Sequence, residues 1–156
     1  PAGRYRDAMA TDNPRFVSAS RVVAASPSDI FALLSDPSRH GDFDGSGMVQ
    51  RARGGSSTLT LGTKFGMDMK LGRLPYRINN TVMEFEQDRL IAWAHLGGHR
   101  WRYELEPVDG GTQVTETFDW STAKFPPFIE RAGYPKKNLA AIERTLDRLV
   151  ELYSAT

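Results

Sequence analysis

The sequence predicts an α+β domain in which a curved, seven-stranded antiparallel sheet surrounds one long C-terminal helix, with two short helices after the first strand. Three observations lead to this expectation. Apolar and polar residues alternate, as they do in strands, through most of residues 46–120. A helix start signal follows the first strand at Ser26-Pro27, and an apolar stripe with helical spacing occupies the end of the chain.

The first segment, residues 1–14, has no useful periodicity, so we expect a disordered tail or residues of non-native origin there and a single domain over 15–156. Residues 15–24 are rich in β-branched and small side chains and predict the first strand. Ser26 is expected to cap a short helix that begins at Pro27, because a capping hydroxyl followed by proline is typical of helix starts.

Pro37 predicts the end of that helix, because the residue before a proline is disfavoured in the α conformation. The pair Asp36-Pro37 can in turn start a second short helix, which we expect to stop by Gly41. Beyond Gly45, turn residues separate six alternating segments that have no helical period. These predicted strands cover about 46–53, 63–72, 75–86, 89–96, 99–108 and 112–120.

The last two predicted strands flank Asp109-Gly110, a dipeptide typical of two-residue hairpin turns. Such a turn places Tyr103 opposite Glu116. A slip by one residue would separate the apolar faces of the two strands, so this register is the expected one. The same register sets Trp101 opposite Phe118 and His99 opposite Trp120.

The long helix is predicted after a connection over 121–134, because apolar residues then recur every three or four positions. Seven strands about 4.8 Å apart form a sheet more than about 30 Å wide, whereas a helix is only about 10–12 Å across. The sheet must therefore curl around the helix, and the enclosed space is either a ligand chamber or a core filled by aromatic rings. The apolar stripe consists of Leu139, Ile142, Leu146, Leu149 and Tyr153.

Composition narrows the classes of function. The 156 residues include 20 basic and 19 acidic side chains, so a net charge of +1 argues against a general attraction for nucleic acid or anionic lipid. The absence of cysteine excludes disulfides and thiol catalysis and fits a reducing compartment. No membrane-spanning run or secretory signal is visible, so we expect a cytoplasmic protein that is not integral to a membrane. We also expect no metal, no nucleotide cofactor and no nucleic-acid partner.

Glu116 is the one carboxylate on the apolar face of its predicted strand, between Val114 and Phe118. Burial would favour the neutral carboxyl and raise its pKa, so Glu116 could act as a general acid or base, oriented by Tyr103. The alternative is a structural pair with Tyr103 and water that needs no substrate. His99 lies on the same face and is a further candidate for proton transfer.

The predicted apolar faces are rich in methionine and aromatic side chains. Such faces suit the binding of hydrophobic ligands of varied shape as well as a packed core. Phe125 to Phe128 precede the long helix and form either a lid or an ordinary connection. The candidate ligand-binding residues are Phe65, Met67, Met69, Trp93, Trp101, Phe118, Trp120, Phe128, Ile142 and Leu146.

Two groups of charged residues look structural. His40, Asp42 and Asp44 match no metal-binding spacing and predict a solvated turn with aspartate caps. Three arginines on outward-facing positions are expected to form a solvated charged face: Arg77, Arg100 and Arg102.

The stretch "VVAASPSDIFALLSDPSRHGDFDGSGMV" resembles the START-like, Bet v 1-like superfamily, in particular its polyketide cyclase/dehydrase and lipid-transport family. Phe43 stands where the family usually has tryptophan, and the segments "RLIAWAH" and "GGTQVTETFDW" are similar to its late strands. The resemblance implies a helix-grip fold with an internal cavity but supplies no catalytic motif. Its signature residues here are Phe31, Leu34, Asp36, Pro37 and Arg39.

These patterns favour a protein that binds or transports a hydrophobic or amphipathic small molecule, such as a lipid, fatty acyl chain or aromatic polyketide, between the long helix and the sheet. A cyclase or dehydratase that uses Glu116 with Tyr103, and with His99 as a further candidate, is the alternative. A protein-interaction module is the third hypothesis. Neither the ligand nor the oligomeric state follows from the sequence.

Overall fold

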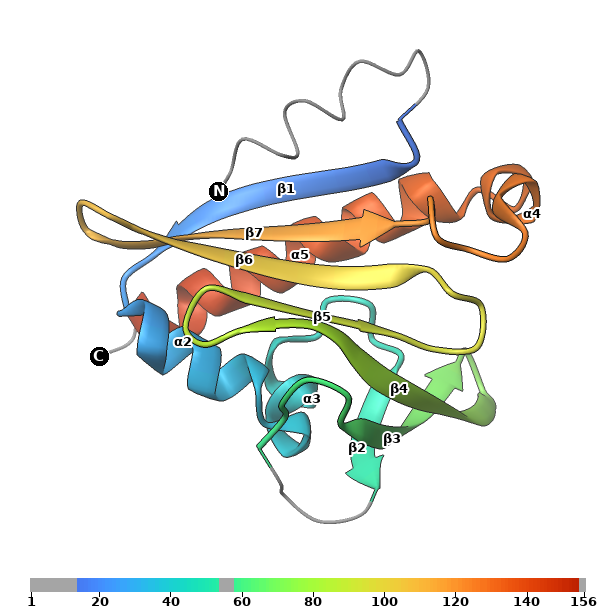
Figure 1. Cartoon of the computed structure of the whole chain (residues 1–156), viewed down its shortest axis with the longest axis horizontal. Coiled ribbons are helices and arrows are strands. Elements are labelled where there is room, and N and C mark those ends of the chain that lie inside the picture. The colour runs from blue at the N-terminus through green and yellow to red at the C-terminus, as the bar shows by residue number, and fades with distance from the viewer. Residues whose placement is uncertain (1–13, 54–57, 155–156) are drawn as a thin grey trace.

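The computed structural model describes residues 14–53 and 58–154, and most of the predicted tail over 1–14 lies outside them. Seven strands form one antiparallel sheet in the order β1-β7-β6-β5-β4-β3-β2 (Figure 1), which confirms the predicted fold class. Each strand pairs with its neighbour in sequence, except that β1 closes onto β7. The strands are β1 Phe16–Val23, β2 Val49–Arg53, β3 Lys64–Leu71, β4 Leu74–Glu86, β5 Leu90–Ala94, β6 Arg100–Val108 and β7 Gly111–Asp119.

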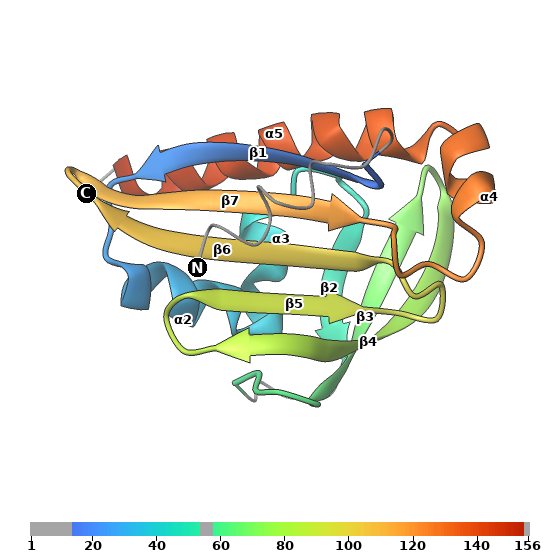
Figure 2. The same cartoon turned by 45° about the horizontal axis from the view of Figure 1, so that its top comes forward.

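The helices cover one face of the sheet. The long helix α5 lies along β1 and β7, and α2 packs against β6 (Figure 2). The sheet curves around them, which is the helix-grip arrangement. The helical elements are α2 Pro27–Leu34, the 3-10 turn η2 Pro37–Arg39, α3 His40–Phe43, α4 Pro126–Arg131 and α5 Tyr134–Ser154.

The predicted start of α2 is confirmed, since the Ser26 hydroxyl accepts a hydrogen bond from the Asp29 backbone N–H at 3.2 Å. Asp36 is extended, as expected before Pro37, and its carboxylate caps the next turn at the Ser38 N–H. The second short helix runs further than the predicted end at Gly41. It comprises η2 followed by α3, which ends at Phe43.

The connection predicted over 121–134 contains one helix, α4, that the sequence interpretation missed. Pro126 and Pro127 begin it, and proline is favoured at a first helical position because its missing N–H has no partner there in any case. The turn that follows leads directly into α5 at Tyr134.

The predicted hairpin register is confirmed: Tyr103 pairs with Glu116 and Trp101 pairs with Phe118. The ladder ends one step later, at Arg100 and Asp119, so the expected His99 and Trp120 pair lies beyond it. Because register is preserved, the inner face of β6 and β7 carries the apolar set together with Glu116.

Gly111 shows why this turn needs glycine. Its φ of 145° lies in a region that residues with a side chain rarely adopt. A Cβ atom there would also lie 2.0 Å from the Val23 carbonyl oxygen on β1. The missing side chain therefore lets β1 approach the end of the hairpin.

The stripe of α5 provides the helical half of the core. Ile142, Leu146 and Leu149 are fully buried on the side that faces β1 and β7. Burying each such side chain contributes roughly 1.5–3 kcal/mol. The helix is thus held against one half of the sheet, and α2 and α3 cover the rest of the concave face (Figure 1).

Candidate ligand-binding site on the inner face of the sheet

Glu116 and Tyr103 form a buried polar pair in the middle of the inner face. The Tyr103 hydroxyl donates a hydrogen bond to Glu116 Oε1 at 2.9 Å, and the two residues are 4% and 3% exposed respectively. The second carboxyl oxygen, Glu116 Oε2, is also buried and has no hydrogen-bond partner among the described residues. An unsatisfied buried polar atom is costly, so this oxygen is poised to bond with a ligand or water.

The surroundings of Glu116 favour its neutral form. Burial is the largest cause and raises the pKa to about 8, against an ordinary value of 4.5; the bond from Tyr103 opposes this, and the charge of Asp44 adds to it. Burial, followed by the nearby Glu116 carboxyl, raises the pKa of Tyr103 well above its usual value. At neutral pH the pair therefore carries two protons and no charge, and it can both donate and accept hydrogen bonds.

His40 is a third polar group of this interior, and the prediction that it lies in a solvated turn is wrong. It is 5% exposed and its ring stacks on Trp93, with centroids 4.9 Å apart. Nε2 lies 2.8 Å from the Leu34 carbonyl oxygen, which can only accept, so Nε2 carries the proton. Burial lowers the pKa of His40 to about 4. The expected aspartate cap is present, since Asp44 accepts from the Ser46 N–H at 3.1 Å.

His40 could have been found from its spacing, because it lies three residues before Phe43 and such residues share one face of a helical turn. Phe43 is also buried, and its ring forms a T-shaped pair with that of Tyr103, with centroids 6.3 Å apart. Thus α3 contributes both an imidazole and an aromatic ring to the surroundings of the Tyr103 and Glu116 pair.

Aromatic rings occupy much of the space around the pair. Trp93 lies between His40 and Tyr103, and its ring centroid is 5.6 Å from that of Tyr103. Phe65 meets Trp93 edge to face at 5.7 Å. The lining is therefore apolar and polarizable apart from the three polar groups.

A second aromatic group extends from Glu116 toward the end of the sheet where β7 finishes. Phe118 stacks on Trp120 with ring centroids 5.5 Å apart and contacts Trp101 at 4.9 Å. The Trp120 indole N–H donates to Glu130 of α4 at 3.0 Å. These rings connect the polar pair to the region around α4.

The segment after α3 is fastened to α5 at Gly45. Its backbone N–H donates to the Thr145 hydroxyl at 2.8 Å, and Arg144 Nε donates to the Gly45 carbonyl at the same distance. A Cβ atom on Gly45 would lie 2.4 Å from the Thr145 backbone nitrogen, so only glycine permits this approach. The contact holds Asp44 where its charge acts on Glu116.

Most predicted ligand-binding residues are gathered in this interior. Phe65, Met67, Trp93, Phe118, Trp120, Ile142 and Leu146 are buried, while Met69 and Trp101 are half-buried. Phe128 is different: it is 65% exposed on α4 and lies outside the interior.

His99 lies apart from the polar pair. Its ring meets His95 at 4.3 Å and Phe118 at 5.2 Å between centroids. Burial, and then the neighbouring His95, lower its pKa to about 4. In the part of the chain described, no hydrogen bond joins His99 to Glu116 or Tyr103.

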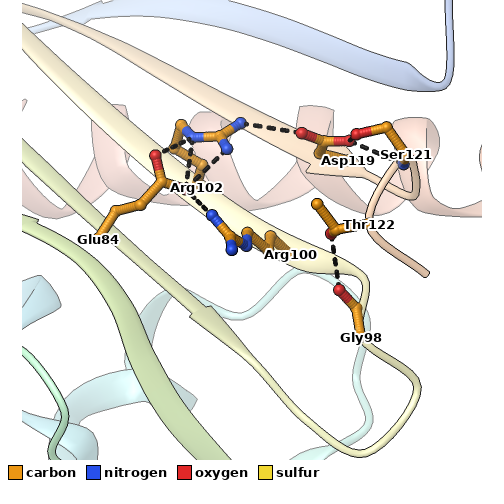
Figure 3. Close-up of polar contacts among 7 residues, drawn as sticks. All are labelled: Glu84, Gly98, Arg100, Arg102, Asp119, Ser121 and Thr122. Carbon is orange, nitrogen blue, oxygen red and sulfur yellow. Dashed lines mark hydrogen bonds and ion pairs between the residues drawn. The ribbon is translucent and has the colours of Figure 1, made fainter. Parts of the chain in front are cut away.

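The outward-facing arginines correct another expectation, because Arg102 is 3% exposed and is not part of a solvated face. Figure 3 shows it between two carboxylates, Glu84 of β4 and Asp119 of β7. The Arg102 Nη2 to Glu84 Oε2 distance is 2.7 Å, and Arg100 reaches the same oxygen at 3.1 Å. Arg77 is 73% exposed, as predicted for it.

A groove of about 700 Å³ lies away from the polar pair, beside the β3–β4 turn. Of the predicted ligand-binding residues, only Met69 lines it. Three basic side chains, Lys70, Arg73 and Arg77, and one acid, Asp68, line it together with apolar and aromatic surface. The lining residues are Gln50, Asp68, Met69, Lys70, Arg73, Pro75, Tyr76 and Arg77.

Residues 14–53 and 58–154 contain no group of three His, Cys, Asp or Glu side chains arranged to hold a metal ion. Within the same ranges, no helix combines the length and apolar character needed to cross a bilayer.

The fold is therefore a helix-grip sheet that carries a buried polar pair among aromatic rings on its inner face. The chain belongs to the polyketide cyclase/dehydrase and lipid transport family, whose model matches residues 15–153. This confirms the resemblance seen in the sequence.

The chain is also similar to a curated relative, and solved structures share its fold. The chain is 42% identical over 146 residues to the uncharacterized protein Rv0088 of Mycobacterium tuberculosis, covering 90% of this chain and 65% of that protein's length. A crystal structure from Rhodobacter sphaeroides superposes with a TM-score of 0.69 at 17% identity, covering 90% of this chain and 93% of the other. A solution structure of a polyketide-cyclase-like protein from Corynebacterium glutamicum has a TM-score of 0.59 at 22% identity, with 93% of each chain covered.

Proposed function

We propose that the chain binds a largely apolar small molecule, such as a lipid, fatty acyl chain or aromatic polyketide, between α5 and the inner face of the sheet. The observation that carries the proposal is the buried Glu116 Oε2, which lacks a hydrogen-bond partner among the described residues. Protonated Glu116 would donate from this oxygen to a carbonyl or hydroxyl oxygen of the ligand. Family membership supports a ligand of this chemical class.

The rings around Glu116 must move to admit such a ligand. Trp93, Phe118 and the half-buried Trp101 contact one another or the polar pair through ring faces and edges, which can slide without breaking hydrogen bonds. Binding would therefore replace ring–ring contacts by ring–ligand contacts, with a small net change in free energy.

The test uses two probes, palmitic acid and the aromatic polyketide emodin, followed by amide shifts and by titration calorimetry. Glu116→Gln retains a donor at the same position, whereas Glu116→Leu removes it. We expect the glutamine variant to bind emodin within about threefold of the native chain and the leucine variant about fivefold or more weakly, since one hydrogen bond contributes about 1 kcal/mol. Thr115→Val, on the outer face of the same strand, is the matched control.

The proposal fails if neither probe shifts the amides of Trp93, Tyr103 and Phe118. It also fails if Thr115→Val weakens binding as much as Glu116→Leu. In the first case the aromatic interior is a packed core without a ligand.

Cyclase or dehydratase activity is a second candidate, favoured by the pKa of Glu116 near 8, which leaves a proton available for transfer close to neutral pH. Glu116 would act as the general acid or base and Tyr103 would orient it. Product formation from a poly-β-ketone substrate that is lost in Glu116→Gln, with binding retained, would support this candidate. Binding without any turnover by the native chain would exclude it for that substrate.

A further inference from the structure

The strand topology brings three exposed segments to one end of the molecule. The strands β4, β5, β6 and β7 alternate in direction, so the β3–β4 turn, the β5–β6 turn and the chain after β7 share an end. Figures 1 and 2 both show these segments and α4 at the right-hand end. Gly97 accepts a backbone hydrogen bond from Lys124 at 3.0 Å, which joins two of the three segments.

Exposed apolar side chains concentrate at this end, which we call the rim. The rim side chains are 42% to 85% exposed, whereas the large apolar residues of the inner face are mostly buried. Four other exposed apolar residues of the described chain lie elsewhere and apart from the rim. The rim residues are Leu71 and Leu74 beside the β3–β4 turn, Leu96 in the β5–β6 turn, Phe125 and Phe128 at α4, and Tyr134 at the start of α5.

The rim is also strongly basic. Its segments 70–77, 95–99 and 121–137 contain seven lysine or arginine residues and a single acid, Glu130. That acid is already engaged, because Arg15 and the Trp120 indole both donate to its carboxylate. Two of the cations, Lys70 and Arg73, form no ion pair with any carboxylate of the described residues. The basic residues are Lys70, Arg73, Arg77, Lys124, Arg131, Lys136 and Lys137.

The basic groove beside the β3–β4 turn extends this charge. Its acid, Asp68, is shared by Arg51 at 3.1 Å and by Arg53 and Arg77 at 3.4 Å, so one negative charge faces three positive ones. The local charge around Asp68 is therefore positive.

The opposite end of the sheet has the reverse charge. Residues 86–89 and 104–110, in the β4–β5 and β6–β7 turns and the strand ends beside them, contain five acids and one base, Arg89. The net charge of +1 thus conceals a molecule that is basic at the rim and acidic at the other end. A negatively charged surface would attract the rim and turn the other end away.

We propose that the rim docks onto an anionic phospholipid bilayer, with Leu71 and Leu74 entering the headgroup layer and Lys70 and Arg73 contacting phosphates. Leucines on a narrow turn flanked by cations match the chemistry of this interface, since long basic side chains reach phosphates while apolar ones enter the acyl boundary. The apolar residues project from two turns, the short helix α4 and the start of α5, which suits a deformable layer. This inference does not rest on the proposed function.

The experiment is sedimentation of the protein with vesicles of phosphatidylcholine containing about one third phosphatidylglycerol, an anionic composition that attracts polybasic segments. We expect binding that weakens as salt is raised and that is much weaker with phosphatidylcholine alone. The double variants Lys70→Glu/Arg73→Glu and Leu71→Ser/Leu74→Ser should each lower the partition coefficient by about tenfold or more.

The matched controls are Lys64→Glu and Leu61→Ser, which change an exposed cation and an exposed leucine at the other end of β3. They should bind within about twofold of the native chain, because they lie far from the expected contact. Circular dichroism and urea unfolding verify that every variant remains folded.

The proposal is overturned if the native chain does not sediment with the anionic vesicles at low salt, or if the controls lose as much binding as the rim variants. It is also overturned if the leucine pair instead mediates self-association. In that case ultracentrifugation would show a native dimer that Leu71→Ser/Leu74→Ser converts to monomer without any effect on vesicle binding.

Discussion

The two faces of β6 stabilise opposite protonation states of the carboxyl groups that they contact. On the outer face, Glu84 is buried in part, which by itself raises its pKa, but hydrogen bonds and charge from Arg102 and Arg100 outweigh burial and lower it. On the inner face, Tyr103 is the only hydrogen-bond partner of Glu116 among the described residues, and burial raises the pKa of Glu116 to about 8. Neighbouring residues of one strand, Arg102 and Tyr103, therefore hold one carboxylate charged and the other neutral.

The comparison teaches that charge pairing, not burial alone, distinguishes a structural cluster from a candidate site. The outer cluster pairs its acids with arginines, which is expected of groups that hold strands together. The inner pair leaves one oxygen without a partner among the described residues, which is expected of a site that meets a ligand.

The largest expected effect is a pH-dependent stability difference between the native chain and Glu116→Gln. The native state keeps its proton up to about pH 8 while the unfolded chain releases it near 4.5, so the Glu116 contribution to stability falls as pH rises through this range. The slope is about 1.4 kcal/mol per pH unit. The measurement is urea unfolding of both proteins at pH 5.5 and 7.5. Between these two pH values, the free energy of unfolding of the glutamine variant should rise by about 3 kcal/mol relative to that of the native chain.

Subtracting the unfolding free energy of the native chain from that of Glu116→Gln removes the effect of the buried histidines. Burial lowers the pKa values of His40 and His99 to about 4, so they contribute stability that is lost as pH falls from about 6.5, the opposite sign to Glu116. Both histidines are present in both proteins and cancel. A difference that stays constant between the two pH values would show that Glu116 is ionised in the native state.

The next effect tests the ion pairs on the outer face of the sheet. Arg102→Met removes the partner of both Glu84 and Asp119 and should lower the free energy of unfolding by about 2–3 kcal/mol. Arg100→Met removes a more exposed partner of Glu84 and should cost less than about 1 kcal/mol. Equal losses in the two variants, measured by urea unfolding at neutral pH, would contradict the central position of Arg102.

A further effect concerns Tyr103→Phe, which removes the only hydrogen bond that Glu116 accepts among the described residues. We expect a loss of about 1–2 kcal/mol in unfolding free energy. Because that bond lowers the pKa of Glu116, its removal should also move the carboxyl titration to higher pH. A titration unchanged in the variant would mean that the hydroxyl does not bond to the carboxylate.

Local patterns were sufficient to predict Glu116 and Tyr103 as partners. A two-residue turn and an alternation of period two determine the register of a hairpin, and both are visible in residues close together in the chain. The cap at Ser26 and the extended Asp36 were predictable for the same reason, since each depends on neighbouring residues alone.

The remaining parts of the site depend on contacts between distant elements. Its spacing from Phe43 indicates that His40 shares the buried face of α3. The stacking of its ring on Trp93 of β5 depends on how α3 docks on the sheet, which local spacing does not specify. Arg102 is buried beside Glu84, whose strand shifts register at an irregularity between Val82 and Glu84. Periodicity predicted the correct face for Arg102 but not its partner.

Carbon-13 NMR titration of the glutamate carboxyl groups tests the central claim most directly. With the signals assigned by Glu116→Gln and Glu84→Gln, we expect Glu116 to titrate near pH 8 and Glu84 below 4.5 in the same sample. A Glu116 midpoint near 4.5 would mean that the inner carboxylate is charged at neutral pH, and the proposed neutral hydrogen-bond donor would not exist.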